Sequence, residues 1–444
     1  MEVDVLIIGG VAAGTSAGAA AKRIDGSLNV LLIQKEKYIS YGGCGLPYYI
    51  EGLINTIDEI VEFTPEKFRE KKGVDVMVLH EVYEVDFDKK IAKVRSLENG
   101  EKFEVGYKKL IISTGASPII PKMEGVEDDR VFTIRTPEDA IKIRSFIKEK
   151  NPKNAVIVGG GYIGVEMAEA IAANGVKVAI VEALGNLLTN AEPEINEVIL
   201  EDLKRNGVEV YLNSAVQKLV PDEKVKVITT SGEIEGDFVL IAVGVRPNTE
   251  IFELEKGVKG AIKVDALGKT SVQDVYAAGD CATAKHVITG KDVYIPLGTT
   301  ANKQGRVAGR VAAGGIDRFP GVVGANITKI FDIEFARVGL TKKEAIKEGF
   351  DADDIYVKTK SRAAYYPGAG SVHVKLVFDK KTARILGAQI AGKEVHRRID
   401  VIASAIHGKL TVMDLGYMDL SYAPPFSPVW DPILIAGNVA RRKI

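Results

Sequence analysis

Cysteine is scarce in this sequence, with only Cys44 and Cys281 among 444 residues. Two cysteines cannot build a disulfide framework, and their spacing matches neither a CxxC redox pair nor a zinc site. We expect Cys281, beside Asp280, to be a packed small residue. Any thiol chemistry therefore falls to Cys44.

Other absences narrow the class of protein further. A formal net charge of -1 excludes a dedicated nucleic-acid binder, which needs a basic surface. No apolar run approaches the roughly 18 residues of a membrane span. Glu2 and Asp4 stand where a signal peptide would be cationic, so we expect a cytoplasmic protein. At about 150 residues per domain, the length predicts two to four domains.

The stretch from Ser40 to Ile50 places Cys44 between glycines, just before an expected helix start. Pro47 fits this geometry, because proline is tolerated in the first helical turn. The N-terminal end of a helix favours a thiolate, so the stretch predicts a reactive cysteine. The alternative is an inert cysteine in a glycine-rich loop.

A strand, a glycine turn and a helix open the chain. The apolar run from Val3 to Ile8 leads into the turn from Gly9 to Gly14, and Gln34 follows the next strand. This order is typical of a dinucleotide-binding unit with a ribose-binding acid about 20 residues after the turn. Val11 replaces the second glycine and Gln34 replaces the acid. Gln34 can still hydrogen-bond a ribose hydroxyl, and Glu36 is a possible substitute.

A second unit is closer to the full pattern. Gly159, Gly161 and Gly164 complete a GxGxxG turn after an apolar strand, Glu166 lies in the first helical turn, and Glu182 ends the following strand. Pyrophosphate binds at such a helix N-terminus, where glycine lets the backbone approach closely. The chain is therefore predicted to hold two dinucleotide sites.

The rest of the chain indicates how the domains are arranged. The strand that ends at Asp280 suggests that the first domain is interrupted by the second, and the alternating run from Val372 to Phe378 indicates an antiparallel α+β region. The predicted fold is α/β, with two Rossmann-like dinucleotide-binding domains and a C-terminal α+β domain. The expected boundaries are 1–113 and 242–325 for the first domain, 114–241 for the second, and 326–444 for the third.

With these motifs, the sequence resembles the flavoprotein disulfide reductases with two dinucleotide-binding domains. The stretch around Cys44 resembles their single-cysteine branch, which includes coenzyme A (CoA) disulfide reductases, CoA-dependent NAD(P)H sulfur or persulfide reductases, and NADH oxidases and peroxidases. The resemblance implies FAD in the first domain, NADH in the second and a homodimer formed by the third. No second cysteine lies near Cys44, so its redox partner must come from outside.

The resemblance also implies which residues bind the cofactors. For FAD these are Gly9, Gly14, Gln34, Lys35, Val82, Thr114, Gly115, Asp280 and Thr299. For NADH they are Gly159, Gly161, Tyr162, Ile163, Gly164, Glu166, Glu182 and Gly244, with Tyr162 as a gate over the nicotinamide pocket. A carboxylate at Glu182 accepts from a 2′-hydroxyl and repels a 2′-phosphate, which predicts NADH over NADPH.

The same resemblance implies that residues from several parts of the chain bind the substrate. The implied CoA contacts are Lys22, Arg23, Ser40, Asn302 and Arg397, with Lys303, His396 and Arg398 as weaker candidates. Charges at helix ends are commonly only solvated, which is the alternative for these residues. Tyr422 is expected to reach the cysteine of the partner subunit. A second tyrosine is expected from Tyr365 or Tyr366, and the sequence leaves that choice open.

These features predict an enzyme that passes electrons from NADH through flavin to Cys44 and on to a CoA-linked sulfur substrate. One alternative is an NADH oxidase or peroxidase that uses a Cys44 sulfenate. Another is an electron-transfer flavoprotein reductase with a structural Cys44. Oxidases of this family carry a histidine in the first phosphate turn, where this sequence has Val11, Ala12 and Ala13, so sulfur chemistry is favoured.

Overall fold

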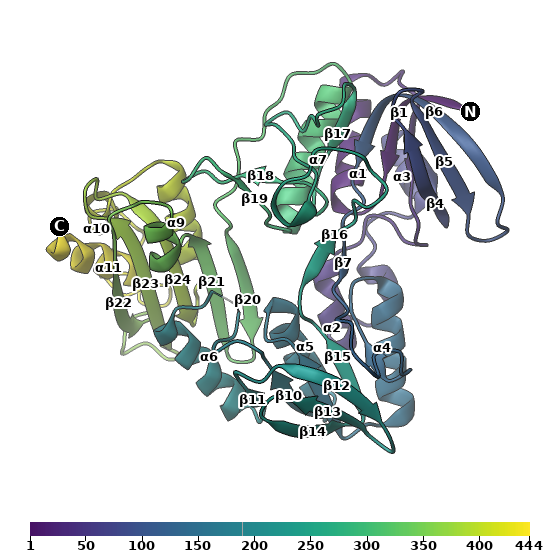
Figure 1. Ribbon diagram of the computed structural model, residues 1–444. Helices are drawn as coiled ribbons and strands as arrows, with labels where there is room; N and C mark the ends of the chain where they lie inside the picture. Colours follow the sequence, from purple (N-terminus) through teal and green to yellow (C-terminus); the bar gives the residue numbers. More distant parts are fainter. Residues whose placement is uncertain (189) are drawn as a thin grey trace.

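The chain forms three lobes in the computed structural model, which describes residues 1–188 and 190–444 (Figure 1). The first lobe is built on a mixed sheet, and its strands run in the order β3 (Asp75–Met77), β2 (Val30–Ile33), β1 (Glu2–Ile8), β6 (Lys102–Ile112), β5 (Ile91–Ser96) and β4 (His80–Asp86). β17 (Val275–Ala277) pairs in parallel with the end of β6. The chain therefore returns to its first sheet after building the second lobe.

Helices α1 (Ala12–Ile24) and α7 (Gly298–Ala312) pack closely on this sheet. A Cβ atom at Gly305 would lie 2.1 Å from the Ala13 carbonyl oxygen, and one at Gly309 would lie 2.1 Å from the Ala17 carbonyl oxygen. Only glycine allows this approach. α3 (Pro65–Lys72) packs beside α1, and the short strands β18 (Ala284–Lys285) and β19 (Asp292–Val293) form a hairpin before α7.

The second lobe contains a parallel sheet in the order β11 (Glu209–Tyr211), β10 (Lys177–Val181), β9 (Asn154–Val158), β15 (Phe238–Ile241) and β8 (Val131–Phe132). An antiparallel sheet of β12 (Val216–Pro221), β13 (Val225–Thr229) and β14 (Gly232–Gly236) accompanies it. Its helices are α4 (Pro137–Lys150), α5 (Tyr162–Ala172) and α6 (Pro193–Arg205). β9 and β15 are apolar on both faces, as a parallel sheet covered on both sides requires.

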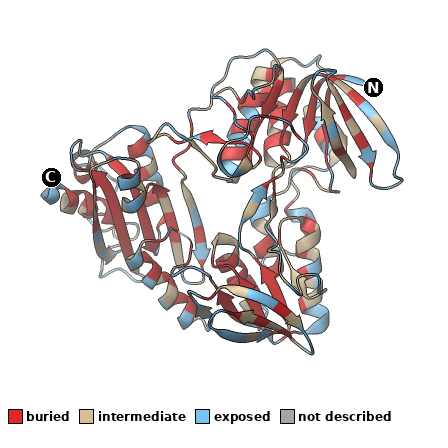
Figure 2. Cartoon of the chain, in the orientation of Figure 1, coloured by how far each residue is buried: buried red, intermediate tan, exposed pale blue. Residues whose placement is uncertain are grey.

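The third lobe is an antiparallel sheet in the order β20 (Asn326–Ile330), β21 (Ile333–Gly339), β24 (Ile385–Gly392), β23 (Ser371–Asp379) and β22 (Ala352–Lys360). Its helices are α8 (Lys342–Lys347), α9 (His396–His407), α10 (Val412–Gly416) and α11 (Pro432–Ala440). In all three lobes the strands are largely buried and the loops exposed (Figure 2). The predicted fold class is confirmed.

Two connections bring the lobes together. β7 (Ala116–Pro118) and β16 (Val245–Pro247) pair in antiparallel fashion where the chain leaves and re-enters the first lobe. The short helix α2 (Leu46–Glu51) lies between β2 and α3 of the first lobe in sequence but packs against α4 and α5 of the second. Cys44 therefore lies at the junction of two lobes. The residues at which each domain begins and ends stay predictions.

Candidate active site

The two glycine turns have matching geometry, one in each of the first two lobes. Gly9 has φ +99° and Gly159 has φ +106°, a conformation that strongly favours glycine. A Cβ at Gly14 would lie 1.8 Å from the Gly9 carbonyl oxygen, and one at Gly164 would lie 2.0 Å from the Gly159 carbonyl oxygen. Both turns therefore bring a helix start against a strand end, as a pyrophosphate site requires.

The residue that follows the second strand of each unit stabilises its turn. The Gly10 N–H donates to Gln34 Oε1 at 2.5 Å, and the Gly160 N–H donates to Glu182 Oε2 at 2.7 Å. Gln34 is buried, and its amide nitrogen donates to the Glu36 carboxylate. Both ends of Gln34 are thus engaged within the protein, which leaves Glu36 as the better-placed group for a ribose hydroxyl. Burial raises the pKa of Glu36.

The missing second glycine of the first turn has a simple explanation. At Gly161, the matching position of the second turn, a Cβ would meet no atom within 4 Å. A side chain at this position therefore faces open space and does not clash with the protein. The first turn can therefore carry Val11 at this position, and Val11 lines the pocket described below.

Asp280 offers a carboxylate oxygen with no protein partner. Its Oδ2 accepts from Arg135 at 2.9 Å, whereas its Oδ1 is buried and unpaired within the described residues. A buried unpaired acceptor calls for a donor such as a hydroxyl. The FAD ribityl chain carries such hydroxyls, so this carboxylate and the first glycine turn fit FAD. Arg135 was missed from the sequence, because no motif surrounds it.

The other residues expected at FAD lie in varied surroundings. Thr114 Oγ1 donates to the Asn248 carbonyl at 2.6 Å, and Gly115 next to it has φ +70°. Lys35 pairs with Glu81 at 2.9 Å. Val82 is buried in β4, and Thr299 is exposed in the first turn of α7. Their contacts with FAD stay predictions.

The residues expected at NADH surround the start of α5. Tyr162 and Ile163 are its first two residues, and Gly244, with φ +116°, follows the neighbouring strand β15. Burial raises the pKa of Tyr162 to about 12, and its hydroxyl donates to Asn326 at 2.6 Å. Both oxygens of the Glu182 carboxylate accept backbone N–H groups, from Gly160 and Leu184.

Cys44 lies in a 3₁₀ turn, Gly43–Gly45, directly before α2, with Pro47 in the first turn of that helix. The side chain is exposed on one side, yet the protein behind it desolvates the thiol. Desolvation and then the charge of Glu166 raise the pKa of Cys44. The sequence predicted that the helix start would favour the Cys44 thiolate and so lower the pKa of this cysteine. That prediction is wrong, because α2 is only six residues long and the negative charge of Glu166 disfavours the thiolate.

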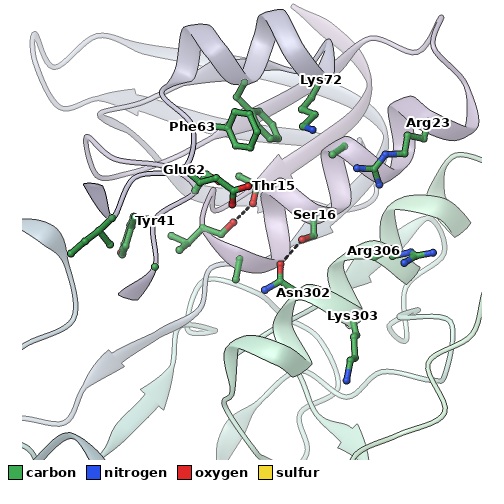
Figure 3. A pocket seen from close by; sticks show the side chains of 17 residues that line it. Thr15, Ser16, Arg23, Tyr41, Glu62, Phe63, Lys72, Asn302, Lys303 and Arg306 are labelled. Atoms are coloured by element: carbon green, nitrogen blue, oxygen red, sulfur yellow. Dashed lines mark hydrogen bonds between the residues drawn. The ribbon is translucent and has the colours of Figure 1, made fainter. Parts of the chain in front are cut away.

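A pocket of about 610 Å³ opens beside the Cys44 loop, between α1 and α7 (Figure 3). Its wall includes Ser40, Tyr41 and Gly42, so it ends two residues before Cys44. Four of the residues that we expected at CoA line it: Arg23, Ser40, Asn302 and Lys303. Lys72 and Arg306 also line it and were not predicted.

The chemistry of this pocket suits phosphate groups. Arg23, Lys72, Lys303 and Arg306 surround it, and within the part of the chain that the structure describes none of them is paired with a carboxylate. Ser16 donates to Asn302 across the pocket wall at 2.7 Å (Figure 3). Unpaired cations around a concave site provide charge-assisted hydrogen bonds to phosphate.

The remaining residues expected at CoA do not line this pocket. Lys22 donates to the carbonyls of Gly26 and Leu28 at 2.7 and 2.9 Å. Arg397 donates to the Phe426 carbonyl, and His396 is exposed at the start of α9. Arg398 is 1% exposed and pairs with Asp431 at 3.0 Å, so it stabilises the third lobe. Cys281, as expected, is fully buried.

The three tyrosines expected near the thiol belong to the third lobe. Tyr422 is hydrogen-bonded to Tyr365, which raises the pKa of Tyr422. The Tyr366 ring instead has the Arg362 guanidinium above it, with Arg362 Cζ 5.8 Å from the ring centroid. The charged groups that act on Cys44 are Glu166, Arg135 and Asp280, and no tyrosine of the third lobe is among them. Within one chain these tyrosines do not meet Cys44.

The chain matches one known protein family over most of its length. Residues 3–305 match the pyridine nucleotide-disulphide oxidoreductase family, and residues 326–432 match the dimerisation domain of the same family. The chain belongs to this family. Its members are oxidoreductases that use FAD and NAD(P)H, which agrees with the two glycine turns.

Individual members of the family are similar to the chain over its full length. The NAD(P)H coenzyme A polysulfide/persulfide reductase of Pyrococcus horikoshii is 40% identical, with 99% of each chain covered. An NADH oxidase of Methanocaldococcus jannaschii is 35% identical, also with 99% of each covered. The coenzyme A disulfide reductase of Staphylococcus haemolyticus is 31% identical, covering 98% of this chain and 99% of that one.

A solved structure of a related enzyme has nearly the same fold as this chain. The NAD-dependent persulfide reductase from A. fulgidus gives a TM-score of 0.96 at 37% identity, covering 100% of this chain and 83% of that one. In the described part of this chain, no helix has the length and apolar content that crossing a membrane would demand.

Proposed function

We propose that this family member is an NADH-dependent flavoprotein reductase of CoA-linked sulfur substrates, namely CoA disulfide, CoA persulfide or polysulfide. One observation carries the proposal: a lone exposed cysteine stands two residues beyond the wall of a cationic pocket, at the junction of two dinucleotide-binding lobes. The curated relatives include reductases of both CoA disulfide and CoA persulfide. The enzyme is expected to act in the cytoplasm, where thiols stay reduced.

Separate sets of residues would bind FAD, NADH and the CoA-linked substrate. The turn from Gly9 to Gly14 and the Asp280 carboxylate would hold FAD, and the turn from Gly159 to Gly164 would hold NADH. FAD, when bound, would supply the two-electron link between NADH and the thiol. The cations of the pocket would hold the CoA phosphates and bring the sulfur end of the substrate toward Cys44.

The chemical step is a thiol–disulfide exchange at Cys44. The thiolate attacks the sulfur–sulfur bond of the substrate, a new bond joins Cys44 Sγ to one sulfur, and the other sulfur leaves as a thiolate that takes up a proton. For CoA disulfide, the product is a Cys44–CoA mixed disulfide and one CoA thiol. Two electrons originating in NADH, together with a proton, then release the second CoA thiol and restore the Cys44 thiolate.

The proton for the leaving thiolate would come from Tyr422 of the partner subunit. A phenol is a reasonable general acid for a thiolate, and the exposed Tyr422–Tyr365 pair is available at the surface of the third lobe. This shared site is consistent with the dimerisation domain of the family. It also accounts for the distance between the tyrosines and Cys44 within one chain.

The Cys44→Ser variant tests the proposal. We expect it to reduce its flavin with NADH at the wild-type rate in stopped flow, but to turn over CoA disulfide and CoA persulfide at least a hundredfold more slowly, because the nucleophile is absent. Cys281→Ser is the matched control, because the buried Cys281 thiol takes no part in the relay. Wild-type turnover of sulfur substrates by Cys44→Ser would contradict the proposal.

Mass spectrometry of the resting protein separates this reading from its alternatives. A CoA adduct on Cys44 supports sulfur reduction. A sulfenic acid would favour an NADH oxidase, the activity named for the Methanocaldococcus jannaschii relative. An unmodified thiol combined with full activity of Cys44→Ser toward a protein acceptor would favour an electron-transfer reductase.

A further inference from the structure

Three polar side chains lie along one face of α5, the helix that begins at the proposed NADH turn. Tyr162, Glu166 and Glu169 are spaced by four and three residues, which places them above one another on a helix. All three are largely withdrawn from solvent, and each is hydrogen-bonded. Their partners all come from β20 and the turn after it, in the third lobe.

The contacts run in register along the two elements. The Tyr162 hydroxyl donates to Asn326 Oδ1 at 2.6 Å, and Thr328 Oγ1 donates to Glu166 Oε1 at 2.8 Å. Glu169 accepts from Lys329 Nζ and, at 2.8 Å, from the Phe331 N–H. Asn326 and Thr328 are two residues apart, so both side chains leave β20 on the same face. The strand therefore holds α5 from its first residue to its third turn.

The Tyr162 ring is fixed at two points by this arrangement. Its hydroxyl binds Asn326, and its ring centroid lies 6.2 Å from that of Phe335, which is fully buried in β21. The ring therefore lies along the side of α5 that faces β20. The helix start next to this ring carries the N–H groups to which a dinucleotide binds, so the position of the ring bears on the coenzyme site.

We propose that Asn326 is a positioning residue for NADH: it holds the Tyr162 ring beside α5 and so keeps the nicotinamide end of the site open. This inference rests on the proposed NADH site. Asn326 acts through Tyr162, whose hydroxyl donates to it. The third lobe, whose sequence matches a dimerisation domain, thus sets the shape of the coenzyme pocket in the second.

A double-mutant cycle tests the proposal in the FAD-loaded protein. We expect Asn326→Ala and Tyr162→Phe each to raise the KM for NADH about fivefold, which is the effect of losing one typical net hydrogen bond. The Kd for NAD⁺, measured by calorimetry, should rise by the same factor. The double variant should be no worse than either single variant, because both remove the same bond. The limiting rate of flavin reduction should change less than KM.

Two further variants separate positioning from a structural effect. Asn326→Asp keeps the oxygen that accepts from Tyr162 but loses the donor to the Gly324 carbonyl at 3.2 Å, so it should bind NAD⁺ nearly as the wild type does. Asn206→Ala removes a comparable half-buried amide that donates to the Asp202 carbonyl in α6, and it should leave NAD⁺ binding unchanged.

Several outcomes would overturn the proposal. Additive effects in the cycle would show that Asn326 and Tyr162 act separately. Tighter NAD⁺ binding in Asn326→Ala would show that the held ring position is the closed one. An Asn326→Asp variant as impaired as Asn326→Ala would assign the effect to the turn at Gly324. None of these results bears on the Cys44→Ser test, so the two proposals fail independently.

Discussion

The Cys44 thiol has a negatively charged neighbour as well as dense protein behind it. Desolvation contributes most to its raised pKa, and the Glu166 carboxylate is the next largest cause. Burial raises the pKa of Glu166 as well, although the hydrogen bond from Thr328 opposes that shift. When the pH falls through the Glu166 pKa, the carboxylate becomes neutral and no longer disfavours the Cys44 thiolate.

Removing this charge should make Cys44 more acidic. We expect Glu166→Gln to lower the Cys44 pKa, because a nearby like charge no longer opposes the thiolate. The rate of alkylation by iodoacetamide, measured against pH on the adduct-free protein, should shift to lower pH. Cys281 is fully buried and will not compete. Glu51→Gln, at the end of α2, is the control, and an equal shift there would contradict the assignment.

Glu182 stabilises the second glycine turn, and we propose that it also selects the coenzyme. Its carboxylate accepts from the Gly160 N–H in the turn at 2.7 Å and from the Leu184 N–H, two residues further on, at 2.8 Å, and a negative charge here would repel a 2′-phosphate. We expect Glu182→Gln to move the ratio of kcat/KM for NADPH over NADH upward about tenfold, corresponding to roughly 1.4 kcal/mol. Initial-rate kinetics with both coenzymes check this. A wild-type enzyme that already prefers NADPH would contradict the predicted choice of NADH.

The sequence was enough to place some of these residues, but it was not enough to predict the pKa of Cys44. Gly159 and Glu182 belong to one continuous strand–turn–helix–strand unit, so their spacing is enough to place them. The pKa of the Cys44 thiol depends first on desolvation by the protein packed behind it, and then on the charges of Glu166, which raises it, and Arg135, which lowers it, both from other elements. A local helix-start argument could not weigh those charges, and it gave the wrong direction for the pKa.

At the scale of elements, the pocket depends on how closely α1 and α7 approach. Arg23 lies on one helix, and Asn302, Lys303 and Arg306 lie on the other. The glycines at the crossing set the distance between the helices, and hence the width of the pocket. Lys72 joins them because α3 packs beside α1. The family resemblance pointed to Arg23 and Lys303, but nothing in the sequence showed that Lys72 and Arg306 face the same cavity.

A methyl group at this crossing should be costly. We expect Gly305→Ala to lower the free energy of unfolding by roughly 1–3 kcal/mol, because its Cβ would lie 2.1 Å from the Ala13 carbonyl oxygen and the helices must move apart. Urea titration followed by circular dichroism measures the change. Gly26→Ala is the matched control, because the nearest atom to its Cβ is 3.9 Å away. Equal losses in the two variants would contradict the close-packing argument.

At the scale of the whole molecule, the proposed site needs two copies of the chain. Cys44 lies at the junction of the first two lobes, whereas Tyr422 lies in the third. Hybrid dimers test whether they meet between subunits. A dimer of one Cys44→Ser chain and one Tyr422→Phe chain retains one complete site if the site is shared, and none if it is not.

We therefore expect inactive Cys44→Ser protein to restore activity to Tyr422→Phe protein. Random exchange of subunits in a symmetric dimer should bring turnover of CoA disulfide to about a quarter of the wild-type rate above the Tyr422→Phe background. Mixing Tyr422→Phe with a Cys44→Ser, Tyr422→Phe double variant is the control, since it holds the same share of chains with Cys44 but no Tyr422. Failure of the first mixture to exceed this control would assign Tyr422 another role.

The overall organisation could largely be predicted from the sequence. Parallel strands that are apolar on both faces, glycine turns and an alternating antiparallel region each leave a local signal, and these signals fixed the fold class. The contacts between lobes leave none, since Asn326 and Thr328 are ordinary residues of an edge strand. Their partners on α5 became visible only in three dimensions.

The hold of β20 on α5 has a consequence for anyone who divides this chain into parts. Residues 1–325 contain both glycine turns, Cys44 and every residue that lines the cationic pocket, and would look like a complete catalytic unit to a protein engineer. Cut there, the fragment would expose the side of α5 to water and free its first aromatic ring. The proposed coenzyme site is therefore not a module that can be transplanted without the lobe beside it.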